Sequence, residues 1–124
     1  MKNLKKILLI DDEVDYLHLL TMMLRHQGFD VYSISNGQEI SEVIHSFKPD
    51  LILLDIRLGI LNGQELCRQL KSDPGTKHVK IILHSAFPNI ENEYQLCGAD
   101  DFVLKPTDVN DLISRINCQL ESTS

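Results

Sequence analysis

The chain alternates five short apolar runs with longer segments in which apolar residues recur every three or four positions. Short apolar runs are typical of buried strands, and a spacing of three to four is typical of amphipathic helices. The expected strands are Lys6–Ile10, Asp30–Ile34, Leu51–Asp55, Lys80–His84 and Asp101–Leu104. Such an alternation favours parallel strands joined by helices that cover both faces of one sheet, an open doubly wound α/β fold of five βα units.

Turn-forming residues indicate where the helices begin and end. Leu17, Leu20 and Leu24 follow a helical period, and Gly28 can adopt the left-handed conformation that ends a helix. A second helix is expected near Ile40–Phe47, between an Asn36-Gly37 turn and Pro49. Three more are expected at Asn62–Leu70, Ile90–Cys97 and Val109–Leu120. Thr107 or Asp108 would cap the last of them.

Length and charge limit the classes of protein that fit. The 124 residues are enough for one core, and we expect a single domain over residues 1–124 with no output domain. A net charge of -6 with scattered Lys and Arg argues against direct nucleic-acid contact. The apolar run Ile7–Ile10 is too short for a signal peptide or a membrane span.

Cysteine and histidine spacing indicates neither zinc nor disulfides. Cys67, Cys97 and Cys118 lie far apart without a CxxC pair. A reducing cytoplasmic compartment is therefore expected. The five histidines show no ligand spacing and are interpreted as structural or surface residues rather than metal ligands or phosphorelay donors.

Polar residues follow several of the expected strands. Asp11 and Asp12 follow the first, Asp55 ends the third, Ser85 follows the fourth, and Lys105 follows the fifth. In open parallel sheets, ligands bind outside the carboxyl ends of the strands, so these side chains are the candidate site.

Three carboxylates at one place repel one another unless a cation compensates them. Magnesium suits the expected set, because it takes one or two carboxylates, other oxygen atoms and water, here Asp12, Asp55 and a nearby backbone carbonyl. Lys105 supplies a second positive charge on the far side of Asp55. A carboxylate between two cations can accept a phosphoryl group, and Ser85 can then hydrogen-bond the phosphate.

Each of these residues also has an ordinary structural interpretation. An Asp-Asp pair after a strand is commonly a helix cap with a solvated neighbour, and Asp55 could begin a turn. Phe102 at a strand position is by default a core residue, and the pair Lys105-Pro106 alone could be an ordinary loop. The order of all these residues along the chain, rather than any one of them, indicates a site.

That order resembles the response-regulator receiver family over about Lys5 to Leu120. The motifs are ILLIDDE at Ile7–Glu13, DLILLDIRLGILNG at Asp50–Gly63, IILHSA at Ile81–Ala86 and GADDFVLKP at Gly98–Pro106. The resemblance implies that Asp55 is the phosphorylated residue, that Asp12 and the Arg57 carbonyl bind magnesium directly, and that Asp11 acts through water or a hydrogen bond. Lys105 would contact the phosphate.

The resemblance also implies a switch and a topology. Ser85 would be the hydroxyl that moves toward the phosphate, and Phe102 the ring that then turns inward. The Lys105-Pro106 bond would be cis, and the strand order 2-1-3-4-5 is the one that chemotaxis receivers share with flavodoxin.

The chain departs from the family pattern at a few positions. Leu58-Gly59 replaces a usual Met-Pro pair and should loosen that loop. Arg57 and Phe87 are bulky where the family varies and flank the path of a hydrolytic water. Thr107 replaces a frequent aromatic residue, which weakens any inference about a dimer surface.

By resemblance, a sensor histidine kinase or phosphotransfer protein would donate the phosphoryl group, and an unknown protein would bind the switched surface. The chain would not be an enzyme, although it would assist its own phosphorylation. One alternative is a magnesium-dependent phosphatase with an aspartyl-phosphate, but that class usually needs a second acid where Arg57 stands. Another is a receiver-like scaffold or a nucleotide binder, which would need a Gly-rich loop where Asp11 and Asp12 stand.

Overall fold

The computed structural model describes residues 4–58, 61–86, 94–105 and 107–121. Its main element is a five-stranded parallel sheet in the order β2-β1-β3-β6-β7, so the expected 2-1-3-4-5 arrangement is confirmed. The strands are β1 (Lys6–Ile10), β2 (Asp30–Ile34), β3 (Leu51–Asp55), β6 (Lys80–Ser85) and β7 (Asp101–Leu104). β3 lies at the centre, with β1 on one side and β6 on the other.

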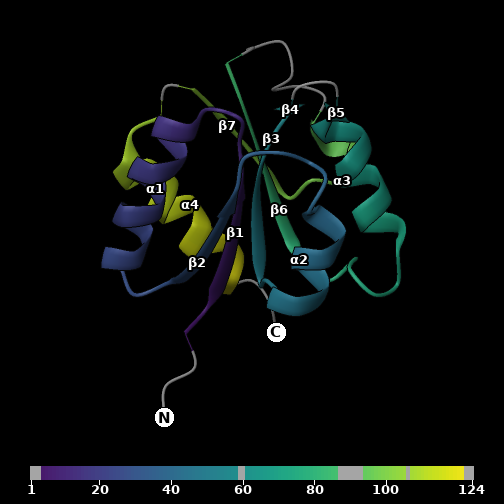
Figure 1. The fold of residues 1–124 in the computed structure, drawn as a ribbon, viewed down its shortest axis with the longest axis horizontal. Helices are drawn as coiled ribbons and strands as arrows, with labels where there is room; N and C mark the ends of the chain where they lie inside the picture. The colour runs from purple at the N-terminus through teal and green to yellow at the C-terminus, as the bar shows by residue number, and fades with distance from the viewer. Residues whose placement is uncertain (1–3, 59–60, 87–93, 106, 122–124) are drawn as a thin grey trace.

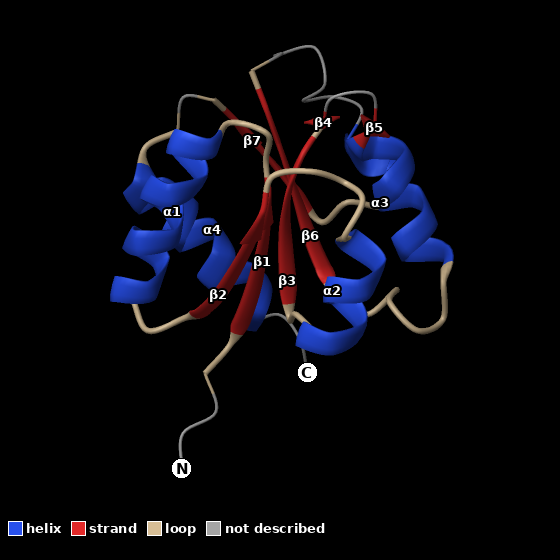
Figure 2. Cartoon of the chain, in the orientation of Figure 1, coloured by secondary structure: helices blue, strands red, loops and turns tan. Residues whose placement is uncertain are grey.

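Helices cover both faces of the sheet, as Figures 1 and 2 show. On one face lie α1 (Val14–His26) and α4 (Val109–Glu121), and on the other lie α2 (Ile40–Phe47) and α3 (Gly63–Ser72). Among the described residues, none of these helices combines the length and the apolar character needed to cross a membrane.

The core has two layers because successive strand residues point to opposite faces. In β1, Leu8 and Ile10 pack with the α2 and α3 layer, whereas Ile7 and Leu9 pack with the α1 and α4 layer. All five residues of β3 are buried. A strand that is buried on both faces appears in the sequence as a continuous apolar run, which is why Leu51–Asp55 could be predicted as a strand.

The helix ends follow the expected turn chemistry. After α1, Gly28 has a φ of 97°, and its N–H donates to the Arg25 carbonyl while the Phe29 N–H donates to the Leu24 carbonyl. These two bonds form a Schellman motif. At α4, the Asp108 side chain accepts a hydrogen bond from the Asn110 N–H, so Asp108 rather than Thr107 is the cap.

Two local features differ from the sequence prediction. The short strands β4 (Arg57–Leu58) and β5 (Leu61–Asn62) pair in an antiparallel hairpin that the apolar pattern did not predict. The helix expected at Ile90–Cys97 is wrong in its last turn, because Tyr94–Cys97 form the 3₁₀-helix η2 and Gly98 follows with a φ of 88°. Tighter 3₁₀ turns are common where a helix ends, and residues 90–93 lie outside the described part.

Candidate functional site

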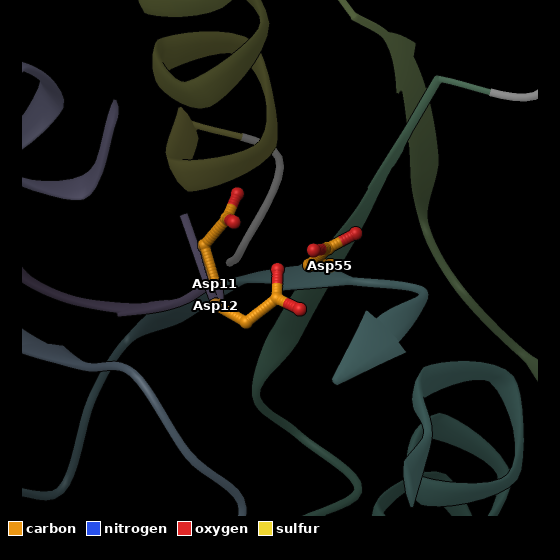
Figure 3. A group of neighbouring side chains, drawn as sticks. All are labelled: Asp11, Asp12 and Asp55. Carbon is orange, nitrogen blue, oxygen red and sulfur yellow. The ribbon is translucent and has the colours of Figure 1, made fainter. Parts of the chain in front are cut away.

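The carboxyl ends of β1 and β3 place three carboxylates together. Asp11 and Asp12 follow β1 directly, and Asp55 is the last residue of the adjacent β3. Each offers an oxygen atom within 4.8 Å of the other two. Figure 3 shows the Asp12 carboxylate extending toward Asp55, whereas the Asp11 side chain is turned away from Asp12. Asp11 and Asp55 are buried, and Asp12 is exposed at the rim.

The electrostatics of this carboxylate cluster favour a bound cation. Burial, and then the negative charge of Asp11, raise the pKa of Asp55 from 3.8 to about 7. The ammonium of Lys105 and the Arg57 N–H, which donates to Asp55 Oδ1 at 3.3 Å, lower that pKa but do not offset the rise. A group of carboxylate oxygens in which one acid resists ionisation is suited to a hard divalent cation such as magnesium.

Lys105 lies among these carboxylates, just after β7. Its Nζ is 2.7 Å from Asp11 Oδ2, 3.5 Å from Glu13 Oε1 and 3.7 Å from Asp55 Oδ2. Burial alone would lower the pKa of Lys105, but the hydrogen bond to Asp11 and the nearby carboxylates outweigh it and leave that pKa raised. We expected this cation beside Asp55, and the structure places it closer to Asp11.

Ser85 and Phe102 lie on β6 and β7, the two strands that follow β3 in the sheet. Ser85 ends β6 with a relative exposure of 2%, and its carbonyl accepts a hydrogen bond from the Lys105 N–H at 2.7 Å. Phe102 in β7 is only 6% exposed and packs in the same core layer as Leu83. The ring expected to turn inward is therefore already inward in this structure, and its switching stays a prediction. The expected cis bond to Pro106, and the expectations for Gly59 and Phe87, fall on residues outside the described ones.

Sequence reasoning missed a polar cluster that lies on the α1 side of Lys105. The Tyr16 hydroxyl is 2.9 Å from His84 Nε2, and Thr107 Oγ1 is 3.4 Å from the same nitrogen. Burial, and then the charge of Lys105, lower the pKa of His84 to about 3, so its imidazole is neutral. His84 was expected to be structural or at the surface, and it is structural. The signal that could have identified it is a histidine in a buried strand, directly after the apolar run Ile81–Leu83.

Gly63 is a second residue whose importance the sequence did not indicate. Its N–H donates to the Ile56 carbonyl at 2.7 Å, and a Cβ added to it would overlap the Asp55 carbonyl oxygen and lie 2.7 Å from Ile56 Cα. Only glycine allows this close approach. The start of α3 is thereby held against the backbone that carries Asp55, with the Asn62 side chain capping the helix.

Comparison with known proteins agrees with this geometry. Residues 7–117 match the family model for the response regulator receiver domain. The chain is 36% identical over 121 residues to the phosphate regulon transcriptional regulatory protein PhoB of Pseudomonas aeruginosa, covering 96% of this chain and 53% of that protein. It is 32% identical over 116 residues to the DNA-binding response regulator MtrA of Mycolicibacterium paratuberculosis, covering 94% of this chain and 51% of that protein. The chain thus spans about half the length of these two curated relatives.

Solved structures share the fold. A CheY-like response regulator receiver domain protein from Methanospirillum hungatei has a TM-score of 0.84 at 30% identity, with 96% of this chain and 95% of that one covered. The response regulator TrrA of Thermotoga maritima, solved in complex with Mg(2+)-BeF, has a TM-score of 0.83 at 28% identity, with 94% and 99% covered.

Proposed function

The chain belongs to the response regulator receiver domain family, and from that premise we propose that it is a phosphoacceptor whose Asp55 receives a phosphoryl group. The observation that carries this proposal is the position of Asp55. Asp55 as a residue is 6% exposed, its carboxylate adjoins those of Asp11 and Asp12, and the Lys105 ammonium lies 3.7 Å from its Oδ2. A carboxylate that faces both a cation-binding cluster and an ammonium is arranged for phosphoryl transfer.

The donor atoms fit magnesium. Asp12, Asp55 and the backbone carbonyl of Arg57 are the proposed direct ligands, and Asp11 is proposed to act through water. The bound ion would neutralise negative charge on the transferred group. The TrrA structure with Mg(2+)-BeF supports this choice of metal by similarity.

The residues of the chain have distinct proposed roles in the transfer. An Asp55 carboxylate oxygen attacks phosphorus, the bond to the donor's leaving group breaks, and the bonding pair departs with that group. The Lys105 ammonium, held 2.7 Å from Asp11, neutralises charge on the phosphoryl oxygens. The Ser85 hydroxyl then hydrogen-bonds a phosphoryl oxygen, and its displacement is proposed to reach Phe102 and the surface around β7.

The proposed donor is a sensor histidine kinase or phosphotransfer protein, and the proposed recipient of the signal is another protein. No separate enzymatic activity is proposed. The net charge of -6 supports a role without direct nucleic-acid contact by these residues. Cys67, Cys97 and Cys118 are thiols rather than halves of disulfides, which supports the proposal of a reducing, cytoplasmic compartment.

The test is incubation with acetyl phosphate, with and without magnesium, followed by intact mass measurement. Wild type should gain one phosphoryl group only with magnesium, and Asp55→Asn should gain none. Asp50→Asn is the matched control, since Asp50 lies just before the other end of β3 and should leave phosphorylation intact. A wild type that stays unmodified would favour a scaffold, and rapid magnesium-dependent turnover of acetyl phosphate without accumulation would favour a phosphatase.

A further inference from the structure

The polar cluster of Tyr16, His84 and Thr107 has no role in the function proposed above, although it adjoins the site. Tyr16 lies in the first turn of α1, and its ring faces the Lys105 ammonium at 5.0 Å from the ring centroid. An ammonium within about 6 Å of an aromatic face is attracted by the ring quadrupole. Tyr16 is therefore a direct neighbour of the cation that the proposed chemistry needs.

A residue of the sheet holds the Tyr16 ring in place. Its hydroxyl shares a 2.9 Å hydrogen bond with His84 Nε2, and the two rings lie 5.2 Å apart at 53°. His84 is 1% exposed and belongs to β6, which is paired with β3 at Asp55 and with β7 at Val103. A residue within a strand that is paired on both sides has little freedom to move.

Lys105 needs such a constraint. Its side chain has four methylene groups and carries much rotamer entropy when free. The carboxylates around it pull its Nζ mainly toward Asp11, at 2.7 Å, rather than toward Asp55, at 3.7 Å. The Tyr16 ring, with its centroid 5.0 Å from Lys105 Nζ, occupies space into which the ammonium could otherwise move and attracts it by a cation–π contact.

We infer that Tyr16 is a positioning residue, which holds the Lys105 ammonium beside Asp55, and that His84 fixes the Tyr16 ring for this purpose. The inference rests on the proposed function, because positioning matters only if Asp55 accepts a phosphoryl group. Thr107, in the loop after β7, supports the arrangement, because its hydroxyl donates to the Leu104 carbonyl at 2.7 Å and lies 3.4 Å from His84 Nε2.

The first measurement needs neither metal nor phosphoryl donor. In metal-free protein, the ring current of Tyr16 should shift the proton resonances of the Lys105 side chain next to its ammonium. Tyr16→Leu should remove that shift, and Tyr16→Phe should keep most of it. Tyr32→Leu is the matched control, because Tyr32 is 45% exposed in β2 and pairs with Phe47 instead. An unchanged Lys105 spectrum in Tyr16→Leu would overturn the placement.

The second measurement is the rate of phosphorylation by acetyl phosphate at saturating magnesium. Tyr16→Leu should slow it about tenfold, about 1.4 kcal/mol, a size suited to a desolvated cation–π contact. In Tyr16→Phe the phosphorylation rate should fall about twofold to threefold, because the ring remains but its hydrogen bond to His84 is lost. Adding His84→Leu to Tyr16→Phe should not slow phosphorylation further, because the hydrogen bond between positions 16 and 84 is already lost. Magnesium affinity should not change.

A double-mutant comparison distinguishes positioning from a general structural effect. In a Lys105→Ala background, Tyr16→Leu should have no further effect on the rate, since the cation that it positions is absent. An equal loss in both backgrounds, or wild-type rates in Tyr16→Leu, would overturn the inference. Failure of wild type to be phosphorylated would instead refute the proposed function, and the Lys105 spectrum would still decide where Tyr16 holds the cation.

Discussion

Replacing Asp55 by asparagine in metal-free protein should raise the free energy of unfolding. Asp55 is buried, and burial together with Asp11 raises its pKa to about 7. Above that pH the folded protein must hold a charge that its surroundings disfavour. Asparagine has nearly the same shape without the charge, so the variant avoids this cost.

The magnitude follows from the shift. The pKa of Asp55 changes from 3.8 to about 7. The difference is about 3 units, and at 1.36 kcal/mol per unit it corresponds to about 4 kcal/mol at pH 8. Part of the gain is lost because the amide must also be buried, so we expect a net increase of about 2 to 3 kcal/mol.

The sign of the pH dependence is fixed by the same shift. Since the pKa of Asp55 is higher in the folded protein than in the unfolded chain, the folded state binds more protons between those two values. The unfolding free energy of wild type should therefore fall as pH rises from about 4 to 7. In Asp55→Asn this part of the pH dependence should be missing.

The assay is urea unfolding in EDTA at pH 5 and pH 8, followed by circular dichroism. Asp50→Asn is the control: Asp50 accepts a hydrogen bond from the Lys6 N–H at 2.8 Å, so this variant should gain no stability. Adding magnesium should narrow the difference between wild type and Asp55→Asn, because a ligand of the native state stabilises only the protein that binds it. Equal stability of Asp55→Asn and wild type at pH 8, or a stability difference at pH 5 as large as that at pH 8, would contradict this prediction.

Three further predictions concern the metal, the switch and the start of α3. Asp12→Ala should remove most magnesium binding, because it deletes a proposed direct ligand, and an NMR titration in which Asp55 still shifts as in wild type would contradict this. Ser85→Ala should still be phosphorylated but should show smaller amide shifts around Phe102 with beryllofluoride, which stands in for the phosphoryl group; identical shifts would argue against this coupling. Gly63→Ala should lose about 2 kcal/mol of stability, since its Cβ would lie 2.7 Å from Ile56 Cα, and an unchanged urea midpoint would disagree.

The fold was predictable from sequence because its pattern is local. Each buried strand is a continuous apolar run, and each helix has its own period and stop residues, so the alternation could be read without knowing any long-range contact. The exceptions are the β4–β5 hairpin and the 3₁₀-helix η2. Both are short elements whose conformation depends on neighbouring residues rather than on a hydrophobic period.

The members of the site were predictable for a related reason. Once the strands are parallel, their carboxyl ends share one edge, and Asp11, Asp55, Ser85 and Lys105 must lie near it. The sequence thus determined which residues meet. It could not determine the distances between their side chains, because those distances depend on the way in which the long side chains pack.

Only the tertiary structure showed that Lys105 Nζ lies 2.7 Å from Asp11 and 3.7 Å from Asp55, and 5.0 Å from the centroid of the Tyr16 ring. The structure alone also placed His84 against Tyr16, a contact between residues 68 positions apart. Apolar periodicity records how each segment faces the core, and the strand ends indicate which residues share one edge of the sheet, but neither indicates which of those side chains come into direct contact. Those contacts are fixed by packing and charge in the folded molecule.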